Sequence, residues 1–266
     1  MKYINTDKIN KLQLNKDNIF IILDFDRTIT SFESVDSWDA CGGLLESGFK
    51  KDIDSYFDYY RPIEIDYTID IKEKEKYMEE WYSKCIDLYE KYKLTKQKLD
   101  ESVNVAKIEF RDGAEEFLKR VNEYDIPVII LSAGIGNVIE IFLKKHNLYF
   151  DNMYIIGNFI KFDETGDMKP FNSNNMIHTL NKTMKNHLPE KYENIIKEKE
   201  YAILVGDLIS DKEMVPENIL EKVLTIGFLN EENNIDVYNK EFDIVLYKED
   251  ANFSNIEKIL KKERKD

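Results

Sequence analysis

The chain has little cysteine, no long apolar run and fewer basic than acidic residues, and each shortage excludes a class of protein. Cys41 and Cys85 are its two cysteines, too few and too far apart for a disulfide framework or a cysteine-ligated zinc site. No apolar run approaches the length that crosses a bilayer, and the first residues lack the apolar core of a secretion signal. We therefore expect a soluble, cytoplasmic protein.

The balance of charge is acidic. Asp and Glu number 52 against 38 Lys and Arg, which gives a formal net charge of −14. Such a surface repels nucleic-acid backbones and anionic membranes, so we expect neither as a partner. A small anionic substrate stays compatible with it, because a local cation can hold one. The 266 residues allow a large core with an inserted module; they do not indicate an oligomeric state, and a monomer is compatible with them.

Apolar, β-branched runs alternate with helical patterns over most of the chain. Six runs are typical of buried strands in a parallel sheet, and they lie at residues 19–23, 126–131, 154–156, 201–205, 223–228 and 243–247. Apolar residues at helical spacing lie between them, among other places at 137–146 and 176–186. This alternation predicts an α/β fold with a doubly wound parallel sheet.

Residues 31–105 carry helical patterns and no convincing strand. One apolar stripe recurs at steps of three and four residues, through Met78, Trp81, Tyr82, Cys85, Ile86 and Tyr89. Arg61-Pro62 is expected to end an earlier helix, and residues 62–66 to form an extended connector. An all-helical block between strand–helix units indicates an insertion. We therefore predict a helical cap at residues 31–105 and an α/β core at residues 1–30 and 106–266.

Two acids, Asp24 and Asp26, stand where the first predicted strand leaves the sheet. Because side chains alternate in an extended segment, both carboxylates can project from the same side. Open α/β sheets bind ligands at this place. A solvated turn explains the same two acids, and the short pattern alone leaves the two interpretations evenly balanced.

Polar residues also follow two other strands, which favours the functional interpretation. Ser132 and a glycine-rich turn follow the run at 126–131 and open a helix, where unpaired N–H groups form an anion site. Asp207 and Asp211 follow the run at 201–205; taken alone, they are ordinary helix caps. Parallel strands bring these ends to one edge, and several acids beside an anion site require a cation. Oxygen ligands select a hard ion, which predicts Mg²⁺.

The motifs resemble those of the haloacid dehalogenase superfamily of phosphotransfer enzymes. Asp24-Phe25-Asp26-Arg27-Thr28 is similar to its first motif, Ser132 to its second, and Gly206-Asp207 with Asp211 to its fourth. Longer strings resemble the cytosolic 5′-nucleotidase III, or pyrimidine 5′-nucleotidase, family: Glu64-Ile65-Asp66, Tyr77-Met78-Glu79-Glu80-Trp81-Tyr82, Ser132-Ala133-Gly134-Ile135-Gly136, Asn158-Phe159, Phe162-Asp163-Glu164-Thr165-Gly166 and Asn181-Lys182.

This resemblance implies a Rossmann-like core with a helical cap and a Mg²⁺-dependent 5′-nucleotidase. Such an enzyme hydrolyses nucleoside 5′-monophosphates, of the UMP, CMP or 7-methyl-GMP type, through an aspartyl-phosphate. The family pattern makes Asp24 the nucleophile, Asp26 the general acid and base, and Lys182 the third motif's lysine. It further implies that Ser132, the Ala133 N–H and Lys182 bind the phosphate, that Asp24, the Asp26 carbonyl and Asp207 hold Mg²⁺ with Asp211 in support, and that Glu64 contacts the base.

Two departures from the family pattern fall in the predicted cap. Cys85 stands where the family often has serine, and the cysteine-containing segment that follows the first motif in relatives is not reproduced at residues 38–43. Taken without the family, Lys182 and Glu64 are ordinary surface residues. Two other functions stay open: a phosphatase for another small ester, such as phosphoserine or a sugar phosphate, and a binding module without catalysis. The sequence does not decide between a pyrimidine and 7-methylguanine.

Overall fold

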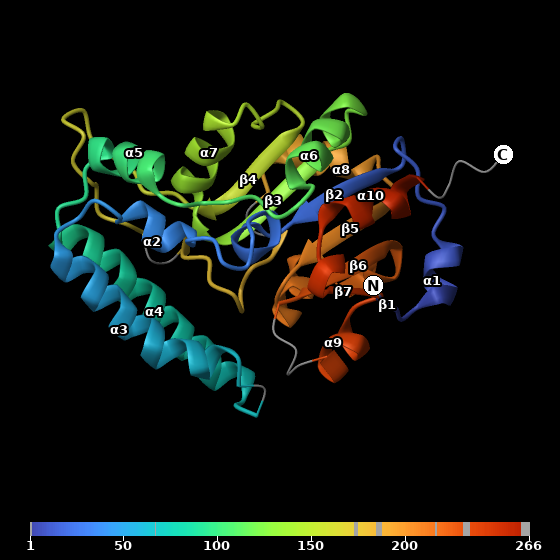
Figure 1. Cartoon of the computed structure of the whole chain (residues 1–266), viewed down its shortest axis with the longest axis horizontal. Helices are drawn as coiled ribbons and strands as arrows, with labels where there is room; N and C mark the ends of the chain where they lie inside the picture. Colours follow the sequence, from blue (N-terminus) through green and yellow to red (C-terminus); the bar gives the residue numbers. More distant parts are fainter. Residues whose placement is uncertain are drawn as a thin grey trace.

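The computed structural model describes residues 2–66, 68–172, 175–184, 188–215, 217–230 and 235–261. Strands alternate with helices along most of this chain (Figure 1). The strands are β1 (Lys2–Tyr3), β2 (Ile19–Leu23), β3 (Val128–Ile135), β4 (Met153–Asn158), β5 (Tyr201–Gly206), β6 (Val223–Leu229) and β7 (Ile244–Tyr247). The helices are α1 (Thr6–Lys11), α2 (Ser37–Cys41), α3 (Ser47–Glu64), α4 (Ile71–Lys91), α5 (Lys96–Val105), α6 (Ala114–Glu123), α7 (Gly136–Lys145), α8 (Glu190–Lys197), α9 (Ile235–Glu241) and α10 (Phe253–Lys261).

The strands form one sheet in the order β1-β7-β6-β5-β2-β3-β4. All neighbouring strands from β7 to β4 are parallel, and β1 adds an antiparallel edge next to β7. Strand β2 lies inside the sheet, between β5 and β3. This confirms the α/β class and the parallel sheet, and all six predicted strands are present.

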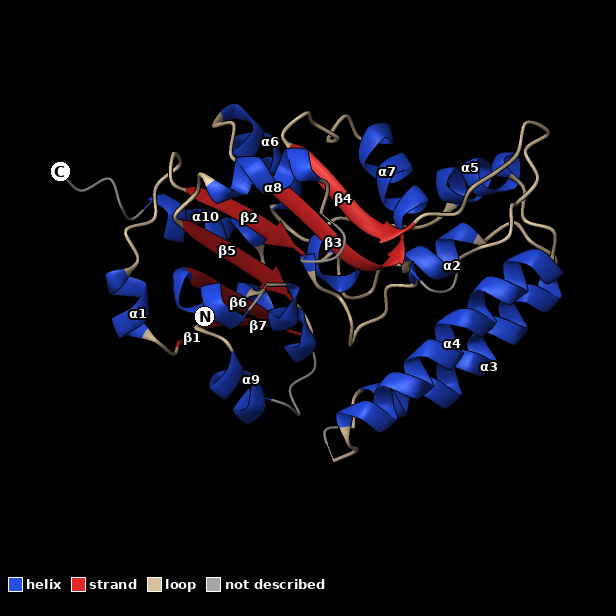
Figure 2. Ribbon diagram, turned by 180° about the vertical axis from the view of Figure 1, so that it is seen from behind, coloured by secondary structure: helices blue, strands red, loops and turns tan. Residues whose placement is uncertain are grey.

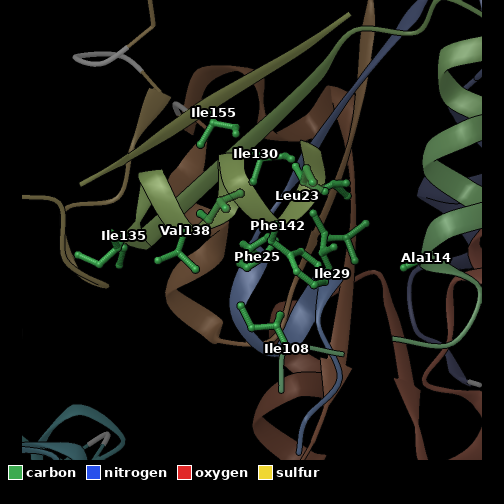
Figure 3. Packing of buried hydrophobic residues seen from close by; sticks show 14 of the residues in the cluster. Leu23, Phe25, Ile29, Ile108, Ala114, Ile130, Ile135, Val138, Phe142 and Ile155 are labelled. Atoms are coloured by element: carbon green, nitrogen blue, oxygen red, sulfur yellow. The ribbon is translucent and has the colours of Figure 1, made fainter. Parts of the chain in front are cut away.

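Alternate residues of β2 enter two separate cores on the two faces of the sheet. Ile21 and Leu23 pack with residues of α6, α7 and α10 on one face, and Ile22 packs with residues of α8 and α9 on the other. Figures 1 and 2 show these helix sets from opposite sides. In the first core, the side chains of Leu23 and Ile130 gather above Phe142 of α7 (Figure 3). Both faces are covered, which explains why the strand runs are continuously apolar.

The described part of residues 31–105 holds helices α2 to α5 and no strand of the sheet. Helices α3 and α4 form an antiparallel hairpin beside the sheet (Figures 1 and 2). Helices α2 and α5 lie next to α7. The arrowheads of the parallel strands point toward the side where the hairpin lies (Figure 2). The positions of these helices are compatible with the predicted division into core and cap, which stays a prediction.

The predicted break at Pro62 is wrong, because α3 continues through it to Glu64. Proline removes one helix hydrogen bond and usually ends a helix. Here the long apolar face of α3 packs along α4, with the rings of Tyr60 and Trp81 stacked at 5.7 Å. This tertiary contact holds the last turn of α3 in helical form. Glu64 is therefore the end of a helix rather than part of an extended connector.

The predicted helix at 176–186 is also wrong over its described residues, 176–184, which form turns. The Asn158 side chain binds both the N–H (2.9 Å) and the carbonyl (2.8 Å) of Ile177. The Asn181 side chain binds the carbonyl of Met176 (2.9 Å) and the N–H of His178 (2.8 Å). Side chains thus take backbone groups that a helix would need. Residues 185 and 186 lie outside the described part of the chain.

Among the described residues, the helices are too short or too polar to cross a lipid bilayer. Both cysteines are buried thiols without a disulfide bond.

Candidate active site

A buried ion-pair cluster lies at the carboxyl ends of β2 and β5. Asp24 directly follows β2, and its N–H donates to the Val205 carbonyl of β5 at 3.0 Å. Lys182 Nζ donates to Asp24 Oδ1 and, at 2.9 Å, to Asp211 Oδ1. All three side chains are almost fully buried. The turn segment 176–184 thus brings a lysine to the edge of the sheet where the sequence predicted the acids to meet.

Asp207 completes a group of three carboxylates. One oxygen each of Asp24, Asp207 and Asp211 lies within 4.8 Å of the others. Both Asp211 oxygens are already engaged, Oδ1 by Lys182 and Oδ2 by the N–H groups of Asp207 and Leu208 at 2.9 Å. Residue 206 must be glycine, because a Cβ there would lie 2.2 Å from Asp211 Oδ2. Asp211 therefore orients the Asp207 backbone.

The donor set fits a hard divalent cation. Asp24 Oδ2 is buried and has no hydrogen-bond partner among the described residues, an arrangement that costs free energy unless something else compensates it. Asp207 Oδ2 accepts one hydrogen bond, from Asn230 Nδ2 at 3.1 Å. Carboxylate oxygens without nearby histidine or cysteine suit Mg²⁺. Asp24 and Asp207 are the acids with capacity left for such an ion.

The electrostatics of the acids point to the same need for positive charge. Burial raises the pKa of Asp24 to about 6, an effect that Lys182 opposes and Asp211 reinforces. Burial and the charges of Asp24 and Asp211 raise the pKa of Asp207 to about 8. Burial lowers the pKa of Lys182, but Asp211 and Asp24 outweigh it and the net shift is upward. The lysine is firmly charged, yet one cation does not balance three acids.

Asp26 is held by Ser37, the first residue of α2. The Ser37 hydroxyl donates to Asp26 Oδ2 at 2.5 Å, and its N–H donates to Oδ1 at 2.9 Å. Burial, followed by the charge of Asp36, raises the pKa of Asp26 to about 7, near the value that suits a general acid and base at neutral pH. Gly134 is required here, because a Cβ would lie 2.0 Å from Ser37 Oγ and 2.6 Å from Asp26 Oδ2.

Ser132 and Ala133 lie beside these acids, but on a strand rather than in the predicted turn. Strand β3 continues to Ile135 with an irregular register after Leu131, and α7 begins at Gly136. The Ser132 hydroxyl accepts a hydrogen bond from the Gly134 N–H at 2.9 Å. The predicted anion site therefore falls on an irregular strand end rather than on a turn that opens a helix.

A cavity of about 360 Å³ joins the acids to the α3–α4 hairpin. Glu64 lies at the hairpin end, where its carboxylate accepts from Arg61 Nη1 and from Thr179 Oγ1, the latter at 2.8 Å. Seven of the eight candidate residues line this one cavity, namely Asp24, Asp26, Glu64, Ser132, Ala133, Lys182 and Asp207. The eighth, Asp211, is the acid that orients Asp207.

The two departures in the predicted cap also lie at this cavity. Cys85 of α4 lines it, and burial raises the pKa of its thiol to about 12, so the thiol is neutral at physiological pH. Trp38, at the start of residues 38–43, lines it as well. Its ring meets the edge of Tyr82 at 5.2 Å and stacks on Tyr89 at 6.1 Å. Trp38 thus lies in the cavity lining together with Trp81 and Tyr82, and we call these three rings the aromatic wall.

Comparisons with known proteins show the family to which the chain belongs. The family profile described as pyrimidine 5′-nucleotidase (UMPH-1) matches residues 20–263. The chain belongs to this family. The relatives of this UMPH-1 member include the 7-methylguanosine phosphate-specific 5′-nucleotidase A of Xenopus laevis, 30% identical over 92% of this chain and 88% of the relative. The enzyme of the same name from Drosophila melanogaster is 34% identical over 85% of this chain and 74% of the relative.

Solved structures agree with the family assignment. The crystal structure of cytosolic 5′-nucleotidase IIIB bound to cytidine superposes with a TM-score of 0.80, at 28% identity over 97% of this chain and 91% of that one. A phospho-aspartyl intermediate analogue of phosphoserine phosphatase superposes with a TM-score of 0.57 at 19% identity and shows a shared fold. The chain is thus an enzyme of the 5′-nucleotidase type with a haloacid dehalogenase fold, as the sequence motifs predicted.

Sequence reasoning missed several polar residues of this UMPH-1 site. Ser37, Arg61, Thr179 and Asn230 contact the predicted residues directly. Asp36-Ser37 carries a signal for a helix start, because Asp is a favoured N-cap, and Asp36 caps α2 in the structure. Nothing in the sequence, however, indicates that this helix start lies against Asp26. Arg61 and Thr179 are likewise remote in sequence from the strand ends. Asn230, in contrast, directly follows β6, so the rule that polar residues follow the buried strands at this edge could have found it.

Proposed function

We propose that this enzyme hydrolyses nucleoside 5′-monophosphates to nucleoside and phosphate, with Asp24 as the nucleophile. One observation carries the proposal: the buried acid–lysine cluster and Glu64 line one cavity. Lysine-neutralised acids suit a phosphate ester. A carboxylate near Trp81 and Tyr82 suits a heterocyclic base, which offers N–H groups and a stacking face. A nucleotide has both features at its two ends.

The reaction uses a covalent intermediate on Asp24. Its carboxylate oxygen attacks phosphorus while the bond from phosphorus to the 5′ oxygen breaks, and Asp26 gives a proton to the leaving nucleoside. Water then attacks the aspartyl-phosphate, returns a proton to Asp26 and regenerates the Asp24 carboxylate. The raised pKa of Asp26 suits both proton transfers. Lys182, bound to Asp24, reduces the repulsion between the carboxylate and the phosphate dianion.

The remaining candidates bind the phosphate and the metal. Ser132, the Ala133 N–H and Lys182 hold the phosphate oxygens. Asp24, the Asp26 carbonyl and Asp207 would hold Mg²⁺, with Asp211 in support. The ion would supply positive charge that offsets the charge of the phosphate and the carboxylates. The fit is supported by the partnerless oxygen of Asp24 and the all-oxygen donor set.

Helices α2 to α5 act as a cap over this site and exclude water during phosphoryl transfer. The cap supplies Glu64, Trp38, Trp81 and Tyr82 to the cavity wall. We place the enzyme in the cytosol, as the name of its structural neighbour, cytosolic 5′-nucleotidase IIIB, suggests. Its substrate partner is a small nucleotide.

Phosphate release from a panel of nucleoside monophosphates, phosphoserine and sugar phosphates tests the proposal. We expect turnover of nucleotides that EDTA abolishes and added Mg²⁺ restores. Asp24→Asn should lower kcat about 10³-fold or more, because the amide is not a nucleophile. The matched control Asp100→Asn changes an exposed acid of α5 and should retain full activity.

The other outcomes identify the alternatives. Turnover of phosphoserine or sugar phosphates without nucleotide turnover would favour a phosphatase for another small ester. Absence of turnover on the whole panel would favour a binding module. Full activity of Asp24→Asn would refute the nucleophile assignment.

A further inference from the structure

Where the cavity meets the α3–α4 hairpin, the carboxylate of Glu64 is paired with the guanidinium of Arg61. Glu64 is 8% exposed. Its Oε2 accepts from Arg61 Nη1, and its Oε1 accepts from Thr179 Oγ1 at 2.8 Å. Its backbone carbonyl accepts from Lys74 Nζ at 3.0 Å. The negative charge of this carboxylate is therefore compensated within the protein before any ligand arrives.

Arg61 is placed to act on a bound base. Its side chain, 17% exposed, lines the same cavity as Glu64 and the acids at the sheet edge. Burial and the neighbouring acids raise the pKa of Asp207, and the positive charge of Arg61 opposes that shift. Together, Arg61 and Glu64 offer a hydrogen-bond donor beside an acceptor.

The aromatic wall does not by itself choose between bases. Trp81 stacks on Tyr60 at 5.7 Å and meets the edge of Tyr82 at 5.6 Å. Stacking on such rings tolerates any base, because every base has a π-face. Discrimination therefore falls to the polar groups that line the cavity. Asp36, Asp39, Asp54 and Lys50 are among them and act on the overall charge, whereas the Arg61–Glu64 pair and Thr179 form a connected hydrogen-bonded group.

We infer that the Arg61–Glu64 pair makes this site select neutral pyrimidine nucleotides over those of the cationic base 7-methylguanine. A lone carboxylate attracts a base with a positive ring, whereas the guanidinium of Arg61 removes that attraction and repels the ring. A pyrimidine instead places an N–H or amino group next to a ring nitrogen or carbonyl, which matches Glu64 as acceptor and Arg61 as donor. The inference rests on the proposed function and adds the substrate class.

The ratio of kcat/KM for CMP to kcat/KM for 7-methyl-GMP tests the inference. We expect the wild-type enzyme to favour CMP. Arg61→Met keeps the length of the side chain and removes its charge, and it should shift the ratio toward 7-methyl-GMP by about tenfold or more. Arg61→Lys keeps the charge and should stay within about threefold of the wild-type ratio. Arg120→Met removes a charge on α6, outside the cavity lining, and should leave the ratio unchanged.

A double variant shows whether the effect passes through Glu64. In Arg61→Met/Glu64→Gln the uncompensated carboxylate is gone, so the gain for 7-methyl-GMP should disappear. Calorimetric binding of cytidine and 7-methylguanosine to the Asp24→Asn protein gives the same comparison without turnover. Hydrolysis of p-nitrophenyl phosphate, which lacks a base, measures the change that each variant makes at the phosphate end alone.

The failures of the inference and of the proposed function are distinguishable. If nucleotides are hydrolysed but Arg61→Met leaves the ratio within twofold of wild type, the inference is wrong and the function stands. A wild-type preference for 7-methyl-GMP, or a gain that survives in the double variant, would likewise overturn the inference alone. If the wild-type enzyme hydrolyses no nucleotide, the proposed function fails and the inference fails with it.

Discussion

Ser37 is the residue that fixes the acid–base group of the site. Both oxygens of Asp26 accept hydrogen bonds from this one serine, and the Ser37 hydroxyl in turn accepts from the Ile135 N–H at 3.1 Å. The serine is fully buried. Its hydroxyl therefore has one orientation, with its proton directed at Asp26. Ser37 is a positioning residue that ties the catalytic loop to α2 and β3.

Replacement of Ser37 by alanine should slow the reaction without weakening binding. We expect Ser37→Ala to lower kcat for a nucleotide about 10- to 100-fold with a small change in KM, because Asp26 loses one of its two restraints. The loss should be several-fold smaller with p-nitrophenyl phosphate, whose leaving group needs little protonation. Steady-state kinetics on both substrates measure this difference.

A purely structural role would lower both activities equally, and that result would contradict the positioning role. The matched control is Ser55→Ala. Ser55 lies on α3, where its hydroxyl donates to the Asp52 carbonyl of the same helix at 2.6 Å. This variant should behave like the wild-type enzyme on both substrates.

At the scale of elements, the sequence correctly predicts helices and strands that depend on local sequence pattern. It fails for segments whose conformation depends on contacts with residues distant in sequence. The strands are confirmed because short, β-branched apolar runs, such as the five residues of β2, suit a parallel sheet that is covered on both faces. The break at Pro62 and the helix at 176–186 are wrong for opposite reasons. Helix α3 continues past its proline because it packs on α4. The segment that carries Lys182 is not a helix, because the side chain of Asn158, at the end of β4, takes the backbone hydrogen bonds of Ile177.

Proline inside α3 should make this helix less stable than it could be. We expect Pro62→Ala to raise the free energy of unfolding by about 1 kcal/mol or more, because alanine restores an amide donor and removes the clash of the ring with the preceding turn. Urea denaturation measures the change. Pro189→Ala is the matched control: Pro189 precedes α8 at a φ of −65°, so alanine gains nothing there and should be neutral or slightly destabilising.

If Pro62→Ala destabilised the protein as much as Pro189→Ala, the proline would be well accommodated in α3. The test compares the changes in the free energy of unfolding at the two positions. Both variants lose the same proline restraint on the unfolded chain, so a difference between them reports on the folded state.

At the scale of the whole molecule, the site exists only because the topology assembles it. The sequence predicted Asp24, Asp207 and Ser132 at one edge from the rule that parallel strands end together, and the sheet order β5-β2-β3 places them there. Lys182 and Glu64 came from the resemblance to a family. Their contacts, Lys182 with Asp24 and Glu64 with Thr179, span 158 and 115 residues. Local pattern carries no signal for pairs so far apart.

This arrangement brings several acidic side chains close together. We therefore expect these acids to lower the free energy of unfolding of the metal-free protein. Three carboxylates meet within 4.8 Å in a chain of net charge −14, and Lys182 offsets only part of that charge. Asp207→Asn keeps an oxygen that can accept from Asn230. Without Mg²⁺, we expect this variant to be more stable than wild type by about 1–2 kcal/mol at neutral pH. Burial and the neighbouring acids raise the pKa of Asp207 to about 8, so the wild-type side chain must take up a proton on folding, a cost that asparagine does not have.

Magnesium should reverse this order. An ion that binds only the folded state adds about 2.7 kcal/mol at one hundred times its dissociation constant, which for a protein of this size corresponds to roughly 5 °C or more in Tm. Asp207→Asn should lose most of this gain, whereas Asp100→Asn, an equal change in total charge on exposed α5, should keep it. Thermal unfolding with EDTA and with saturating Mg²⁺ measures both effects. A metal-free Asp207→Asn protein that is less stable than wild type, or one that keeps the full response to Mg²⁺, would show that Asp207 belongs to the scaffold and not to a metal site.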